Sequence, residues 1–252
     1  MPGNDLLSYA LDIGEQMLIS GAEVSRVEDS ISRICNAYHA KRVDVFTITS
    51  SIVVTIQTQE GETCTQTRRI HKYNTDLDKL DKLNGLSRYI CKNTPELSYI
   101  DDQLKKLRED KPYGPYVQYL IFAMISGSFT MFFGGSLRDG IVSALVGMLS
   151  KLLLRFVQRA DKNVVFVNLL CSFVIGTLTV LSVYAGIGMD FEKIAIGNIM
   201  LLIPGIALTN SLRDLISGDT IAGLLRLCEA VVIALSVAIG FGLASAIFGG
   251  IL

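Results

Sequence analysis

Residues 117–252 form an almost continuous apolar sequence, in which charged residues occur only in small clusters. Apolar runs of roughly 18 residues or more can cross a bilayer, because about 20 residues rising about 1.5 Å each span its hydrocarbon core. We expect spans at about residues 117–133, 140–157, 164–186, 191–208 and 221–248. Residues 1–112 hold most of the charge. The sequence therefore predicts an α-helical membrane protein with about five transmembrane helices, preceded by a small α+β domain.

The N-terminal domain, residues 1–112, shows two kinds of periodicity. Apolar residues recur at helical spacing from about residue 6 to residue 40, in two pieces separated at Gly21, which suits a helix C-cap. Residues 43–70 are rich in Val, Ile, Thr and Phe, and residues 59–62 suit a hairpin turn. Residues 76–92 and 98–110 predict two further helices. The domain should end at residues 111–116, whose two prolines and one glycine stop a helix.

The expected fourth span is interrupted. Residues 197–219 read GNIMLLIPGIALTNSLRDLISGD, with Pro204 and Gly205 in the apolar part. Proline removes a backbone donor and clashes with the preceding turn, so a helix here should kink or break. A broken backbone survives in lipid only where protein or a water-filled cavity covers it. Because Asn210, Arg213 and Asp214 follow the break, the stretch indicates a transport site.

Charge distribution predicts the orientation. The N-terminus lacks the basic and apolar regions of a signal peptide, so the first domain should stay in the cytoplasm, and the chain in the cell's inner membrane. Basic residues flank three regions that the positive-inside rule places in the cytoplasm. These residues are Lys105, Lys106, Arg108 and Lys111, then Lys151, Arg155, Arg159 and Lys162, and finally Arg213 and Arg226. Five spans then leave the C-terminus outside.

Composition argues against several other classes. The formal net charge of −1 gives no support for nucleic-acid binding. The five cysteines are scattered without CxxC spacing and, like His39 and His71, form no cluster typical of a metal site. We expect reduced thiols, no metal and no cofactor.

Two charged residues lie within expected spans. Lys151 lies deep enough to be a fixed positive charge for a substrate carboxylate, although snorkelling to the interface is an equal alternative. Glu229 has a short side chain, which makes snorkelling harder. An intramembrane carboxylate is a functional candidate, here as a proton carrier or as a partner of Arg226 three residues earlier.

Glu23, Arg26 and Glu28 invite an enzymatic interpretation, since paired carboxylates beside an arginine can perform acid–base chemistry. The simpler interpretation is a solvated helix face with an ion pair at i,i+3 spacing, and we favour it.

The motif Ser-Leu-Arg-Asp occurs twice, at residues 136–139 and at residues 211–214. Each copy closes one expected span and opens the next. Copies so placed point in opposite directions across the membrane, as in inverted-repeat transporters, and their Arg–Asp pairs would be gates at opposite faces. The alternative is a pair of tight turns whose charges neutralise helix ends.

Two long motifs carry a family resemblance. SGAEVSRVEDSISRICNAY at residues 20–38 and LLIPGIALTNSLRDLISGDTIAGLLRLCEA at residues 201–230 resemble the signatures of the threonine/serine exporter (ThrE-type) family. The resemblance covers almost the whole chain. It implies a cytoplasmic domain followed by a transport domain that exports threonine and serine, or C4-dicarboxylates such as succinate. It also implies a split system, in which this chain is the larger subunit and a smaller integral-membrane protein is the partner.

The preferred hypothesis is a secondary exporter. A carboxylate-bearing substrate would bind near the break, and a proton would be taken up nearby. The substrate-binding candidates are Asn198, Pro204, Gly205, Asn210, Arg213 and Lys151, and the proton-coupling candidates are Asp214, Asp219 and Glu229. A smaller membrane subunit, further copies of the chain and membrane lipid are the expected partners. The alternatives are a membrane-anchored enzyme with a hydrolase-like cytoplasmic domain, which has no recognisable nucleophile or metal motif, and a regulatory subunit of a transporter.

Overall fold

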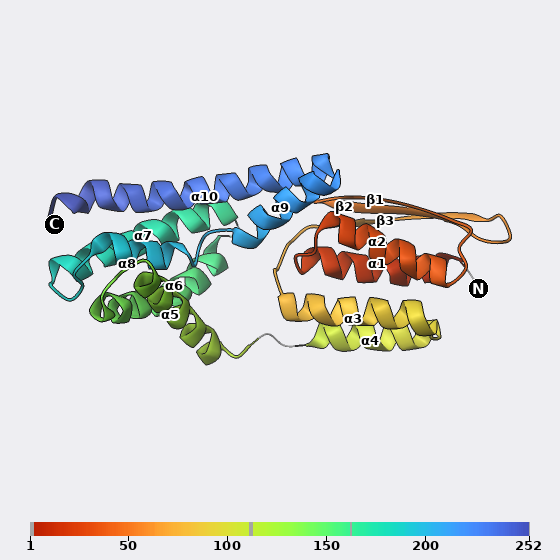
Figure 1. The fold of residues 1–252 in the computed structure, drawn as a ribbon, viewed down its shortest axis with the longest axis horizontal. Coiled ribbons are helices and arrows are strands. Elements are labelled where there is room, and N and C mark those ends of the chain that lie inside the picture. Colours follow the sequence, from red (N-terminus) through yellow and green to blue (C-terminus); the bar gives the residue numbers. More distant parts are fainter. Residues whose placement is uncertain (1–2, 111–112, 162, 252) are drawn as a thin grey trace. The chain divides into compact units, whose positions relative to one another are not determined.

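The computed structural model describes residues 3–110, 113–161 and 163–251, which are mostly helical with one small sheet. Contacts divide the chain into two compact units (Figure 1). The first comprises Met1–Lys111 and Gly205–Cys228, and the second comprises Pro112–Pro204 and Glu229–Leu252. The expected domain boundary at residues 112 and 113 falls on Pro112, outside the described residues, and stays a prediction. The structure adds that residues 205–228 pack with the N-terminal unit.

The first unit is built in layers. Helices α1 (Gly3–Ile19) and α2 (Val24–Ala37) lie between a sheet and the helix pair α3 (Leu77–Asn93) and α4 (Leu97–Glu109) (Figure 1). The sheet holds β1 (Arg42–Ile48), β2 (Ser51–Gln57) and β3 (Thr63–Arg69), antiparallel in the order β1-β2-β3. This arrangement confirms the small α+β domain expected at the N-terminus.

The core of this unit follows the predicted periodicities. Alternate residues of β2 are buried, namely Ile52, Val54 and Ile56. On α2 the residues at helical spacing are buried too, including Val27 and Ile31. The predicted hairpin turn at residues 59–62 joins β2 to β3. The chain turns between α1 and α2 at Gly21, whose φ of +101° favours glycine.

The second unit is a bundle of apolar helices: α5 (Pro115–Phe132), α6 (Leu137–Ala160), α7 (Val164–Tyr184), α8 (Phe191–Ile199) and most of α10 (Thr220–Phe248), which ends in a short 3₁₀ turn, η1 (Gly249–Ile251). Among the described residues, α6, α7 and α10 are long and apolar enough to cross a membrane. The expectation of about five spans is therefore met for three helices, and the full number stays a prediction.

The expected span at residues 191–208 is not one helix. Helix α8 has nine residues, so it rises about 13 Å, roughly half the hydrocarbon thickness. The chain then turns at residues 200–204 and resumes as α9 (Gly205–Ser217). The interruption that Pro204 predicts is thus present. Gly205 is exposed and Pro204 is partly buried.

Candidate functional site

Helix α9 and the start of α10 hold the turn that precedes α2. The Asn210 side-chain amide donates to the Gly21 carbonyl over 2.7 Å. The Val24 backbone N–H, at the start of α2, donates to Asp214 Oδ1 over 3.0 Å. Arg226 of α10 donates to the Ala22 carbonyl over 3.3 Å. Arg213 of α9 also contacts this turn, through an ion pair with Glu23. We call the side chains of Asn210, Arg213, Asp214 and Arg226 the docking cluster. It joins the two motifs on which the family resemblance rests.

Asp214 is the most buried member of the docking cluster, with no exposed surface. Its Oδ2 atom lies 3.3 Å from Arg226 Nη1 but accepts no aligned hydrogen bond. Burial raises the pKa of Asp214 above its usual value, and the nearby Arg226 charge and the Val24 N–H oppose that rise. The environment therefore favours a proton on Asp214 more than water does.

Arg213 forms an ion pair with Glu23, the residue before α2. Glu23 also pairs with Arg26 over 2.9 Å, as the i,i+3 spacing predicts. The prediction of a solvated face is wrong for Glu23, which is only 5% exposed because α9 covers it. Its carboxylate forms ion pairs with the guanidinium groups of Arg213 and Arg26, and through Arg213 it helps to hold α9 in place.

Glu28 is partly buried and serves the sheet. Its carboxylate accepts the Thr47 backbone N–H over 2.6 Å. Burial raises the pKa of Glu28, the Thr47 hydrogen bond opposes that rise, and the charges of Asp219 and Asp214 add to it. Asp219 thus lies close enough to act on Glu28 and on Asp214, and its own side chain is partly buried.

The two charges expected within spans lie apart from the docking cluster. Glu229 is exposed, and Arg226 pairs with Asp214 instead of with Glu229. Of the two roles considered for Glu229, the pair with Arg226 is not formed, because Arg226 points to the buried side of α10, where Asp214 is its partner. Lys151 is partly buried in α6 and places its Nζ 4.8 Å from the centre of the Phe122 ring, a cation–π contact.

A second polar cluster lies inside the apolar helices of the second unit. The fully buried Asn198 side chain of α8 accepts from Ser126 Oγ over 2.8 Å and donates to Ser143 Oγ over 3.0 Å. The Oγ atoms of Ser126 and Ser143 also lie within hydrogen-bond distance of each other, at 2.7 Å. We call these three residues the Ser–Asn cluster. It joins α5, α6 and α8, and it is completed by a bond from Asn198 to the Ile194 carbonyl.

Close packing makes the Ser–Asn cluster possible. A Cβ at Gly197 would lie 2.0 Å from Thr130 Oγ1 and 2.6 Å from the Ser126 carbonyl oxygen. Only glycine lets α8 approach α5 this closely. Asn198 was predicted from sequence, whereas its serine partners were not, since serine is also common where apolar helices simply pack.

The two Ser-Leu-Arg-Asp copies have related but unequal surroundings. Ser136 caps α6 in a reciprocal capping box with Asp139, whereas Ser211 lies inside α9. Asp139 is buried and accepts the backbone N–H groups of Met189 (2.7 Å) and Asp190 (3.2 Å), just before α8. Asp139 and Asp214 therefore both fix the start of another helix, α8 and α2. The inverted repeat and the gates stay hypotheses.

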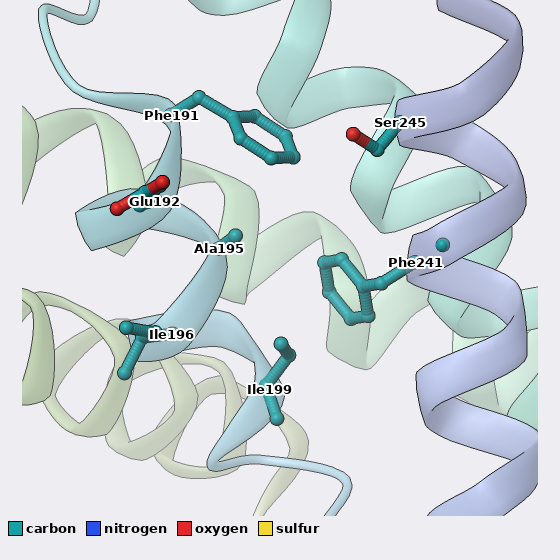
Figure 2. Close-up of a pocket in the computed structure, with 8 residues that line it drawn as sticks. Phe191, Glu192, Ala195, Ile196, Ile199, Phe241 and Ser245 are labelled. Atoms are coloured by element: carbon teal, nitrogen blue, oxygen red, sulfur yellow. The ribbon is translucent and has the colours of Figure 1, made fainter. Parts of the chain in front are cut away.

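An open groove of about 330 Å³ lies between α8 and α10, within the second unit. Figure 2 shows the rings of Phe191 and Phe241 directed into it from its two sides, with Ser245 near Phe191. The other lining residues are Glu192, Ala195, Ile196, Ile199 and Gly242. The groove is mainly apolar. Among the described residues, no group of three or more His, Cys, Asp or Glu side chains could hold a metal ion.

Comparisons with known proteins agree with the sequence motifs. The family model described as "Putative threonine/serine exporter" (ThrE) matches residues 8–248. A "Probable threonine/serine exporter" of Mycobacterium tuberculosis is 24% identical over 240 residues, which cover 93% of this chain and 45% of that protein. The "Threonine/serine exporter" of Corynebacterium glutamicum is 23% identical over 246 residues, which cover 94% of this chain and 50% of that protein.

A fungal protein is also similar. "Pheromone-regulated membrane protein 10" of Pichia sorbitophila is 25% identical over 204 residues, which cover 75% of this chain and 20% of that protein. The chain spans about half the length of the two bacterial exporters. No solved structure matches the chain. The matched family is one of transporters and not of enzymes. Because the family model covers both compact units, the chain belongs to the threonine/serine exporter family.

Proposed function

We propose that the chain is a secondary transporter that exports small carboxylate-bearing metabolites across the cytoplasmic membrane. The substrate is threonine or serine, or a C4-dicarboxylate such as succinate. The observation that carries this proposal is the family match over residues 8–248, together with two bacterial relatives named as threonine/serine exporters.

We propose further that transport requires a second membrane component. The chain spans about half the length of these exporters. The proposed component is a smaller integral-membrane subunit, further copies of this chain, or both, as the family resemblance implies. In the second candidate function, this chain is a regulatory subunit that is inert until its partner joins.

The geometry suggests a route for the substrate. Arg213 has more than half of its side chain exposed although it pairs with Glu23, so it can meet an anion from the cytoplasm. The start of α9 at Gly205 offers backbone N–H groups and the positive end of a helix dipole. Asn210 is already bonded to Gly21, so its amide would have to exchange partners before it could bind substrate.

Asn198 and Lys151 are the binding candidates in the apolar bundle. The Ser–Asn cluster is a polar point among apolar helices, which in a membrane is the usual mark of a substrate or ion pathway. The Asn198 amide bonds to Ser126, Ser143 and the Ile194 carbonyl, so a substrate hydroxyl or carboxylate would replace one of the serines. Lys151 would supply positive charge beside Phe122.

Proton coupling is assigned to the acidic candidates Asp214, Asp219 and Glu229. Asp214 has the best support, because burial raises its pKa and its Oδ2 atom lacks a hydrogen-bond partner. Asp219 acts on Asp214 through its charge. Glu229 is exposed on α10 and is the weakest of the three.

The proposed orientation keeps the N-terminal unit in the cytoplasm and the C-terminus outside. It follows from the basic clusters and the positive-inside rule. Two of the basic residues used for it, Lys111 and Lys162, lie outside the described residues. Arg213 and Arg226 belong to the unit that contains the soluble domain, in keeping with their cytoplasmic assignment.

Transport in inverted membrane vesicles tests the proposal. Vesicles from the protein's own host contain any partner, and they take up externally added substrate through an exporter. Uptake of labelled threonine, serine or succinate should depend on the chain and fall in Arg213→Ala and Asn198→Leu. Asn168→Leu is the control, because the Asn168 amide bonds only to the Val164 carbonyl of its own helix. Wild-type flux in both test variants would refute the site assignment.

A further inference from the structure

Helix α10 is longer than the bilayer requires. Its 29 residues rise about 43 Å, whereas the hydrocarbon core is about 30 Å thick. Placing the whole helix in hydrocarbon would need a tilt of about 45°, beyond the range of up to about 40° seen for transmembrane helices. Part of α10 must therefore lie outside the hydrocarbon.

Charge identifies which part that is. Arg226 and Glu229 both lie in the first third of α10, and residues 230–248 contain no charged side chain. Residues 230–248 rise about 28 Å, which matches the hydrocarbon thickness without residues 220–229. The segment that enters the hydrocarbon is therefore residues 230–248.

Packing supports the same division. Ala222 is 2% exposed and belongs to the hydrophobic core of the N-terminal unit. Arg226 is 6% exposed, donates to the Ala22 carbonyl and faces Asp214. One side of residues 220–228 is thus bound to the N-terminal domain through Ala22 and carries a buried charge pair with Asp214 of α9. Such an arrangement belongs outside the lipid interior.

The opposite side of the same hairpin is apolar and exposed. Its residues, which we call the outer face, are Leu212 (55% exposed), Ile216 (87%), Ile221 (63%), Leu224 (49%) and Leu225 (44%). An apolar patch of this kind on a soluble unit marks an interaction surface. A helix whose free side is apolar is suited to lie in a membrane interface.

We propose that the outer face of the α9–α10 hairpin binds the headgroup region of the cytoplasmic leaflet, and that α10 enters the hydrocarbon only after Glu229. The occupant of this face is lipid, because α10 itself continues into a segment that is apolar enough to cross a membrane. Residues 220–229 directly precede that segment in the chain, so lipid headgroups are the first surface they meet.

This placement revises the role of the charges. Glu229 lies at headgroup level, where a carboxylate is solvated, and no longer at mid-membrane depth. The Asp214–Arg226 pair lies at the cytoplasmic surface, within reach of protons from the cytoplasm. The assignment of this membrane surface to the cytoplasmic side rests on the proposed function. The depth assigned to each residue does not.

Tryptophan fluorescence measures that depth directly, because the natural sequence contains no tryptophan. The full chain is reconstituted in liposomes with one tryptophan at an exposed position: Ile216→Trp, Leu225→Trp, Ile239→Trp or Phe46→Trp. Ile239 is about 15 Å along α10 from Glu229 and serves as the deep control. Phe46, exposed on β1, is the water control. Quenching is compared for lipids brominated near the headgroup and near the chain end.

The proposal predicts that Ile216→Trp and Leu225→Trp are quenched more by the shallow bromines, and Ile239→Trp more by the deep ones. Deep quenching of Leu225→Trp equal to that of Ile239→Trp would overturn the proposal, since α10 would then enter the hydrocarbon near Ile221. Absence of quenching at 216 and 225, as at Phe46→Trp, would also overturn it and would favour a protein partner. None of these outcomes depends on transport, so a failure of the exporter assignment remains distinguishable.

Discussion

Asp214 Oδ1 accepts a hydrogen bond of 3.0 Å from the backbone N–H of Val24, a residue 190 positions earlier in the chain. The N-terminal domain is therefore not merely connected in sequence to the apolar half. The first backbone N–H of its second helix donates to a carboxylate from α9, and Asn210 and Arg226 bond to the carbonyls of the preceding turn. This docking joins the two motifs on which the family resemblance rests.

Replacing Arg226 should weaken this docking severely. In Arg226→Gln the buried Asp214 carboxylate loses its counter-charge, and breaking a buried pair costs about 3 kcal/mol. We expect a lower thermal unfolding midpoint in detergent and faster hydrogen exchange at the Val24 amide. Arg213→Gln is the control, since Arg213 is half exposed and Glu23 keeps Arg26 as a partner. Equal losses in both variants would contradict the assigned role of Arg226.

The effect of Arg226→Gln should depend on pH. Burial raises the pKa of Asp214, so the folded protein binds this proton more tightly than the unfolded chain does. The Asp214 contribution to stability is therefore present at low pH and is lost as pH rises through the raised pKa. Removing Arg226, which opposes the rise, enlarges that loss. The stability gap between wild type and variant should widen from acid to neutral pH, and a gap that narrows would refute this sign.

Gly197 should tolerate no side chain. A methyl group there meets Thr130 Oγ1 at 2.0 Å and must push α8 away from α5, which costs about 1–3 kcal/mol. Gly242→Ala is a matched control on an apolar helix, because nothing lies within 4 Å of its added Cβ. Thermal unfolding in detergent should separate the two variants. A neutral Gly197→Ala would show that α8 does not pack as described.

Asp139 should matter more than Ser136, its partner in the capping box of α6. Ser136→Ala removes one helix cap, worth about 1 kcal/mol. Asp139→Ala also leaves the Met189 and Asp190 N–H groups without their acceptor, so the loss should rise to about 2 kcal/mol or more. Unfolding midpoints of the two variants, measured side by side, provide the comparison. A larger loss for Ser136→Ala would reverse the proposed order.

The sequence predicted the elements better than their partners. Periodicity indicated the helices and the hairpin, and Pro204 indicated the interruption after α8, because these signals act over a few residues. The prediction that Glu23 lies on a solvated helix face was wrong, because a local sequence pattern does not show that α9 covers this residue. A pair of Glu229 with Arg226 was one of two alternatives, and it fails for the same reason: spacing makes an i,i+3 pair possible, but the direction of the buried side of α10 selects Asp214 for Arg226.

The candidate site was predictable only where a residue type is unusual for its surroundings. Asn198 and Asp214 are polar residues in or beside apolar stretches, and both prove to be fully buried. Their hydrogen-bond partners are ordinary: two serines for Asn198 and the Val24 backbone N–H for Asp214. Backbone atoms carry no sequence signal, so this half of the docking cluster appears only in the folded chain.

The proposal that this chain is an exporter is tested by uptake of labelled threonine, serine and succinate into inverted vesicles. The vesicles come from host cells that lack the chain and from the same cells with the chain restored. We expect uptake of one or more of these substrates that requires the chain, falls in Asn198→Leu and persists in Asn168→Leu. Identical uptake in deleted and restored vesicles for every substrate would contradict the assignment of this chain as an exporter.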